Sequence, residues 1–237
     1  MNLLRRVLPA ALLALAAACA QAQATPDGTL YAPGAFDELE VDGAGEIRLS
    51  QGERDEVLVS GDSGARETLD LRLSGRKLLI TVPGSWKFWR SNRLVIDVRM
   101  RQVRELTLSG KTDLHAPGPI KADRMVINIC GSGNVRLDEL TAQQLSFDIS
   151  GAGEGQLAGK VERMGMVISG KGKLRAHGLR TTHANVSISG VGNAEVWATD
   201  ELRVGISGAG RVDYRGEPAL RQTISGVGSI RRQGEPR

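Results

Sequence analysis

The chain has 237 residues, with 31 lysines and arginines against 27 aspartates and glutamates, a formal net charge of +4. Two of the positive charges, Arg5 and Arg6, lie in an N-terminal leader, and the remaining 29 against 27 leave +2, which gives no argument for a nucleic-acid partner. Thirty glycines beside three Trp, two Tyr and three Phe exclude an aromatic-rich core, so we expect an aliphatic core between closely spaced turns.

Residues 1–22 have the layout of a secretory signal peptide, because Arg5 and Arg6 precede an apolar run over residues 7–18. The run is too short to span a bilayer as a helix. Small residues at Ala20, Ala22 and Ala24 predict cleavage after residue 22 or 24. The chain is therefore expected to be exported, to the periplasm, the outer cell surface or the medium.

Cys19 offers a second outcome, because it follows three alanines and resembles the cysteine of a bacterial lipoprotein signal. Lipidation there would tether the protein to a membrane. Ala16 stands where a large apolar residue is usual, which favours plain cleavage. Cleavage leaves Cys130 as the only cysteine, so no internal disulfide is expected.

Residues 25–104 contain strand-like runs bounded by turn residues, which we interpret as irregular β coils. Examples are residues 57–61, 78–82 and 94–98. A separate N-terminal β-domain with a boundary near residues 101–104 is the alternative.

One segment of this region, residues 84–93, combines aromatic and basic side chains between two strand-like runs. The candidate ligand-contact residues are Trp86, Lys87, Phe88, Trp89, Arg90 and Arg93. Such a loop could stack on sugars, pair with anionic polysaccharide or lipid headgroups, or enter a membrane interface. The alternative is that its rings pack against the side of the fold or cap an open coil.

Residues 105–230 carry a regular repeat of an aliphatic residue, serine and glycine. Its glycines are Gly110, Gly131, Gly151, Gly170, Gly190, Gly208 and Gly226, at spacings of 21, 20, 19, 20, 18 and 18 residues. Cys130 replaces serine in one unit, and six of the seven units have a second glycine two residues later. Alternating apolar residues before each unit indicate a half-buried strand, and the glycines are expected to turn the chain through positive φ.

A unit of about twenty residues cannot bury its own apolar face and must stack on a copy of itself. We therefore predict an all-β fold, a β-solenoid resembling a right-handed parallel β-helix, with Ile over Ile inside and Ser over Ser at a corner. Serine hydroxyls could then hydrogen-bond along the stack, and Cys130 is interpreted as a small structural substitute. Residues 231–237 form a polar tail that either guards the open last coil or leaves it free for end-to-end association into an oligomer.

No catalytic, metal or cofactor site is predicted. The residues after the second glycine, which include Asn134, Glu154 and Lys173, supply no carboxylate pair for acid–base chemistry. His115, His177 and His183 lack metal-ligand spacing and are interpreted as exposed loop histidines. The calcium motif of β-rolls is missing, and no helix follows the Gly-x-Gly pairs to bind a dinucleotide phosphate.

The serial Ile-Ser-Gly-x-Gly units, the opening Phe36-Asp37-Glu38-Leu39-Glu40-Val41-Asp42-Gly43 and the leader together resemble the putative auto-transporter adhesin head-GIN family of bacterial exported proteins. The resemblance covers about residues 35–230 and implies a β-helix-like stack. It carries no catalytic residues. Cys130 at a serine position and the aromatic segment depart from the family pattern.

Three functions remain open. The first is a non-enzymatic envelope or surface protein with an adhesin-like role toward polysaccharide or another surface protein. The second is a polysaccharide-processing enzyme, which would need Asp97, Asp113 and Asp138 to meet in one groove. The third is a structural periplasmic spacer or assembly component, and fold resemblance alone cannot choose among them.

Overall fold

The computed structural model describes residues 21–25, 28–61, 68–82 and 95–234. Within these ranges it contains sixteen strands joined into one continuous sheet. The N-terminal strands are β1 (Gln21–Thr25), β2 (Gly28–Ala32), β3 (Glu38–Gln51), β4 (Glu56–Ser60), β5 (Asp70–Ser74), β6 (Lys77–Val82) and β7 (Val95–Met100). The remaining strands are β8 (Glu105–Leu108), β9 (Lys111–Ile129), β10 (Asn134–Ile149), β11 (Ala152–Ile168), β12 (Lys171–Ile188), β13 (Val191–Ile206), β14 (Ala209–Arg215), β15 (Ala219–Ile224) and β16 (Val227–Arg232).

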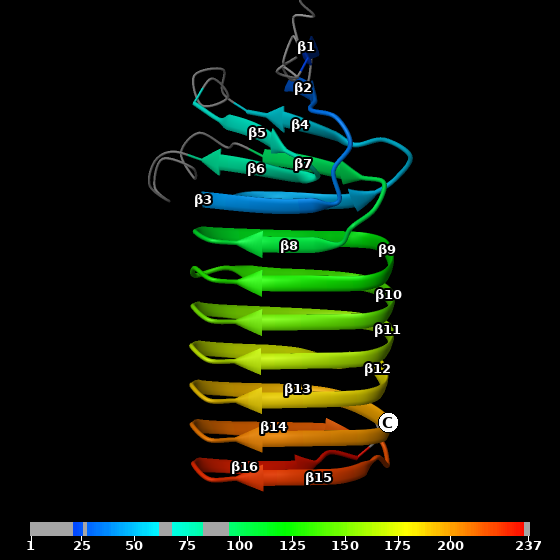
Figure 1. Cartoon of the computed structure of the whole chain (residues 1–237), viewed down its shortest axis with the longest axis vertical. Helices are drawn as coiled ribbons and strands as arrows, with labels where there is room; N and C mark the ends of the chain where they lie inside the picture. Colours follow the sequence, from blue (N-terminus) through cyan, green and yellow to red (C-terminus); the bar gives the residue numbers. More distant parts are fainter. Residues whose placement is uncertain (1–20, 26–27, 62–67, 83–94, 235–237) are drawn as a thin grey trace, which may run out of the picture.

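From β8 onward the strands stack in parallel, one coil upon the next, along the long axis of the molecule (Figure 1). The predicted all-β solenoid is therefore confirmed. Each strand from β10 to β12 bends between its two halves, where the pairing register shifts, once in β10 and β11 and at two nearby places in β12. We call the half that follows a Ser-Gly unit the leading half, the half that precedes the next unit the trailing half, and the shift between them the bend.

The isoleucine ladder sets the register of the stack, as predicted. Its members pair in succession from coil to coil: Leu108, Ile129, Ile149, Ile168, Ile188, Ile206 and Ile224. All of them except the last are at most 1% exposed. Since a slip of one residue would turn this whole apolar row outward, the ladder fixes one register.

The glycines of the repeat are required for close stacking, and the expectation of positive φ at these positions is wrong. A Cβ atom built on Gly170 would lie 2.0 Å from the Gly151 carbonyl oxygen one coil earlier, and the other first glycines from Gly131 to Gly226 are equally crowded. The corner is held by hydrogen bonds between coils, such as Ser169 N–H to the Ile149 carbonyl at 3.0 Å. Positive φ occurs instead at Gly159 and Gly216, next to the bend.

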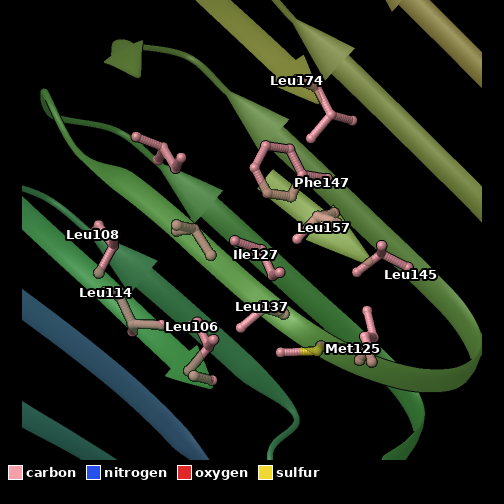
Figure 2. Close-up of a cluster of buried hydrophobic side chains, with 14 of the residues drawn as sticks. Leu106, Leu108, Leu114, Met125, Ile127, Leu137, Leu145, Phe147, Leu157 and Leu174 are labelled. Atoms are coloured by element: carbon pink, nitrogen blue, oxygen red, sulfur yellow. The ribbon is translucent and has the colours of Figure 1, made fainter. Parts of the chain in front are cut away.

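The two halves of each coil bury one aliphatic core between them. Figure 2 shows Phe147 from the trailing half of β10 pointing toward Leu157 and Leu174, which come from leading halves. Gly155, in register between Val135 and Leu174, leaves the room that the ring of Phe147 fills. The large side chain of Phe147 is thus matched by a glycine in the adjacent coil, which keeps the core closely packed.

The N-terminal part of the stack mixes pairing directions. Strand β3 pairs in parallel with β8 and β9 and so continues the solenoid, whereas β2 with β4, β4 with β7 and β5 with β6 are antiparallel. Buried Asp37 at the start of this region accepts a hydrogen bond from Arg76 Nε at 2.9 Å. The division at residues 104 and 105 remains a prediction.

The C-terminal end of the stack is open. Among the described strands, β15 and β16 each pair with a single neighbour. Ile224 is 41% exposed and Val227 is 80% exposed, although Ile206, the partner of Ile224 in the preceding coil, is buried. The described chain ends two residues after β16, at Gly234.

Candidate binding surface

The predicted ligand-contact loop, Trp86, Lys87, Phe88, Trp89, Arg90 and Arg93, lies outside the described residues, as do the leader residues 1–20 with Cys19 and the tail residues 235–237. The strands that flank the loop in sequence are β6 and β7, both of which pair with β3. These assignments therefore stay predictions.

Ion pairs link outward side chains of the leading halves. Arg175 pairs with Glu154 at 2.8 Å and Lys173 with Glu195 at 3.6 Å, each between neighbouring coils. His177 also contacts Glu195, at 3.1 Å. Arg175, Lys173 and His177 each meet a carboxylate of this chain, whereas Lys171 and Arg211, exposed on the same kind of half, form no ion pair within the described residues.

Asp138 is held at the end of this face by Arg136 and His115. Arg136 Nε donates to it at 2.7 Å and His115 Nε2 lies 2.8 Å away. The hydrogen bond from Arg136 and, second, the one from His115 lower the pKa of Asp138 from its usual value of 3.8. This carboxylate is therefore ionised and occupied at neutral pH, which does not suit a general acid.

The three carboxylates that an enzyme would require do not share a site. Asp97 is in register with Arg48, Asp113 accepts a hydrogen bond from Asn134 at 2.6 Å, and Asp138 is held as described above. No two of them have a common hydrogen-bond partner in the described part of the chain, and none lines the surface hollows described below.

The histidines lie in strands β9 and β12, not in loops as expected. His115 and His177 face carboxylates, whereas His183 is exposed on a trailing half. Across residues 21–25, 28–61, 68–82 and 95–234 no three His, Cys, Asp or Glu side chains come together as metal ligands would. Cys130 is exposed at the corner. Within the described residues, no serine hydroxyl of the repeat units forms a hydrogen bond to the next coil.

The bend carries a different surface. We call the six in-register positions along it the bend row: Lys121, Thr141, Lys160, Arg180, Trp197 and Arg215. None of its four cations forms an ion pair within the described residues, in contrast to Arg175 and Lys173 of the leading face. Lys121, Thr141, Lys160 and Arg180 are exposed, and Trp197 and Arg215 are half-buried.

Two hollows follow the first four residues of the bend row, from Lys121 to Arg180. One, of about 790 Å³, is lined by residues that include Gln51, Arg104 and Lys121, and the other, of about 450 Å³, by residues that include Lys160 and Arg180. They share Thr141, Ala142 and Glu162, so they form one continuous depression along the stack. A third hollow, of about 570 Å³, lies beside them on the trailing face and shares Arg124 with the first.

Sequence reasoning missed the bend row although a signal was present. It compared the residues after the second glycine, and Asn134, Glu154 and Lys173 do align in one row as that comparison assumed. The same comparison made eight positions before Ile129, Ile149, Ile168 and Ile188 finds Lys121, Thr141, Lys160 and Arg180, and Trp197 and Arg215 stand nine positions before Ile206 and Ile224.

Comparison with known proteins identifies the fold and a family. The family model described as putative auto-transporter adhesin, head GIN domain, matches residues 35–218. A putative adhesin from Bacteroides fragilis is similar with a TM-score of 0.78 and 21% identity, covering 86% of this chain and 95% of that one. A putative adhesin from Parabacteroides merdae has a TM-score of 0.66 and 22% identity, covering 84% and 92%.

A putative lipid binding protein from Parabacteroides distasonis has a TM-score of 0.62 and 20% identity, covering 84% of this chain and 93% of that one. At these identities the solved structures establish the shared fold alone. No curated protein matches the chain. Where the structure describes the chain, it has no helix with the length and apolar character needed to cross a bilayer.

Proposed function

Because the chain belongs to the putative auto-transporter adhesin, head GIN domain family, we propose that it is a non-enzymatic exported protein of the cell envelope or surface with an adhesin-like binding role. The observation that carries this proposal is the register-locked stack, which repeats outward side chains at the strand spacing of about 4.8 Å. A rigid surface of this kind suits an extended partner, because little conformational entropy is lost on binding. Its partner is a polysaccharide or another surface protein.

The predicted loop is one candidate contact for such a partner, since Trp86, Phe88 and Trp89 could stack on sugar rings while its basic residues meet anionic groups. Attachment to a membrane would come from lipidation of Cys19 or from the same aromatic loop. No cofactor or metal enters this function.

A glycan-array screen of the purified chain tests the proposal. The screen includes a loop variant in which Trp86, Phe88 and Trp89 are changed to alanine. A matched control variant has the exposed Val167, Val191 and Val227 changed to alanine. Binding that the first variant loses and the control keeps would support the loop as the contact. If both variants keep binding, the adhesin-like function is supported with its site elsewhere. If the parent binds neither glycans nor envelope proteins, the proposed function is contradicted.

A second candidate, an assembly component, is favoured by the open C-terminal end. Unpaired edges on β15 and β16 offer backbone groups to further strands. Sedimentation of the purified chain at several concentrations distinguishes the two candidates. Concentration-dependent growth into longer species, together with no ligand binding, would favour assembly.

A further inference from the structure

We propose that the bend row is the contact for a linear anionic polysaccharide that lies along the axis of the stack. This inference rests on the proposed binding function and assigns it a ligand class and a place. The row contains Lys121, Thr141, Lys160, Arg180, Trp197 and Arg215, one residue from each of six successive strands. Five steps of about 4.8 Å give a contact about 24 Å long.

The cations of the row are available to an anionic ligand. Lys121, Lys160 and Arg180 make no ion pair within the described residues, whereas Arg175 and Lys173 on the leading face contact carboxylates at 2.8 and 3.6 Å. Unpaired cations in a shallow hollow can meet an anionic ligand without first breaking an internal pair. The contact is therefore expected to be electrostatic and to weaken as salt screens it.

Trp197 adds a surface suited to a sugar ring. The Thr181 hydroxyl, on a residue that is 1% exposed, donates to the Trp197 carbonyl at 2.8 Å and fixes the backbone there. Gly216 lies next to the indole, because a Cβ atom built on it would be 3.5 Å from Trp197 Cδ1. A side chain at residue 216 would approach the ring, so the glycine leaves this side of it uncovered. Arg215 follows in register, and its buried Nε has no hydrogen-bond partner in the part of the chain that the structure describes.

Neighbouring carboxylates favour a narrow polymer over a flat surface. Asp123, Glu162 and Asp200 border the same depression. Glu162 pairs with Arg163 at 2.7 Å, and Asp123 and Asp200 accept hydrogen bonds from Gln143 and Thr199. A broad anionic membrane would meet these carboxylates together with the cations, whereas a single polysaccharide chain can follow the row alone. The near balance of charge over the whole chain also disfavours nucleic acid.

Binding of dextran sulfate and polygalacturonate, with uncharged dextran as the reference, tests the assignment. The row variant carries Lys121→Gln, Lys160→Gln and Arg180→Gln. The control carries Lys171→Gln, Arg211→Gln and Arg54→Gln, which remove the same charge from exposed positions outside the row. We expect the row variant to bind the anionic polymers at least tenfold more weakly, the control to bind within twofold of the parent, and Lys160→Arg to retain binding.

Equal loss in the row variant and the control would overturn the proposal, because it would show that only net charge matters. Binding of anionic lipid vesicles through the row without binding of the polysaccharides would overturn it in favour of a membrane contact. If the row variant keeps full affinity while the parent binds glycans on the array, the row assignment fails and the adhesin-like function stands. Unfolding curves of all variants establish that each is folded.

Discussion

The ring of Phe147 occupies the space that a side chain at residue 155 would need, since a Cβ atom built on Gly155 would lie 2.5 Å from Phe147 Cζ. Phe147 lies in the trailing half of β10, and Gly155 lies in the leading half of β11. Their fit shows that the core is matched between coils as well as within them.

Gly155→Val is expected to lower the free energy of unfolding by about 1–3 kcal/mol, because an overpacked core must shift its side chains or backbone. Phe147→Leu should partly restore the stability lost in Gly155→Ala, because the smaller leucine leaves room for the added Cβ atom. Urea unfolding measures both effects. Gly205→Ala is the control, since nothing lies within 4 Å of its added Cβ, and a loss there equal to that at residue 155 would refute the packing argument.

Gly170→Ala should destabilise the stack by about 3 kcal/mol or more, because its Cβ would lie 2.0 Å from a backbone oxygen that cannot rotate away. Ser169→Ala next to it should change stability by less than about 0.5 kcal/mol, since this exposed hydroxyl makes no hydrogen bond within the described residues. Thermal and urea unfolding compare the pair. A larger effect at the serine would mean that the hydroxyl ladder holds the corner after all.

The sequence was sufficient to predict the stack because its strongest constraint is a repeating one. The isoleucines recur at nearly constant spacing, so pairing Ile149 with Ile168 and Ile188 follows from periodicity. The role of the glycines was misassigned because a distance such as that from Gly170 to the Gly151 oxygen exists only between coils. Local turn preferences carry no information about it.

The candidate surface was harder to predict for a related reason. Lys173 is paired and Lys160 has no ion pair within the described residues because of the residues in the neighbouring coils, and Glu195 is 22 residues from Lys173 in sequence. The predicted contact loop around Trp86 is prominent in composition, yet it lies outside the described residues. The bend row has no distinctive composition and becomes visible only when the register is known.

The contribution of Asp138 to the free energy of unfolding should decrease at acid pH. Its pKa is lowered in the folded state, first by the hydrogen bond from Arg136 and then by that from His115. The contribution is therefore fully present well above the unfolded value of 3.8 and is lost as pH falls through 3.8 toward the lower folded pKa. The stability difference between the parent and Asp138→Asn should shrink between pH 6 and pH 3. A difference that stays constant over this range would contradict the assigned interactions.

Because the C-terminal end of the stack is open, the same substitution should lower the free energy of unfolding by different amounts at different positions of the isoleucine ladder. Ile188→Ala should cost about 2–5 kcal/mol, because Ile188 is 1% exposed between two coils. Ile224→Ala should cost less than about 1 kcal/mol, because Ile224 is 41% exposed on a strand with a single neighbour. Urea unfolding at low protein concentration measures both. Equal costs would indicate that another chain covers this end in solution.

The most direct test of an extended binding surface is the affinity of the chain for dextran sulfate fractions of increasing length at fixed salt. A partner that follows the bend row should bind more tightly, per molecule, as its length grows to about 24 Å, the span of six strands at 4.8 Å. Beyond that length the affinity should rise only slowly, as the number of equivalent placements increases. An affinity that is the same for the shortest and the longest fractions would contradict binding along the stack and would locate the contact at a single point.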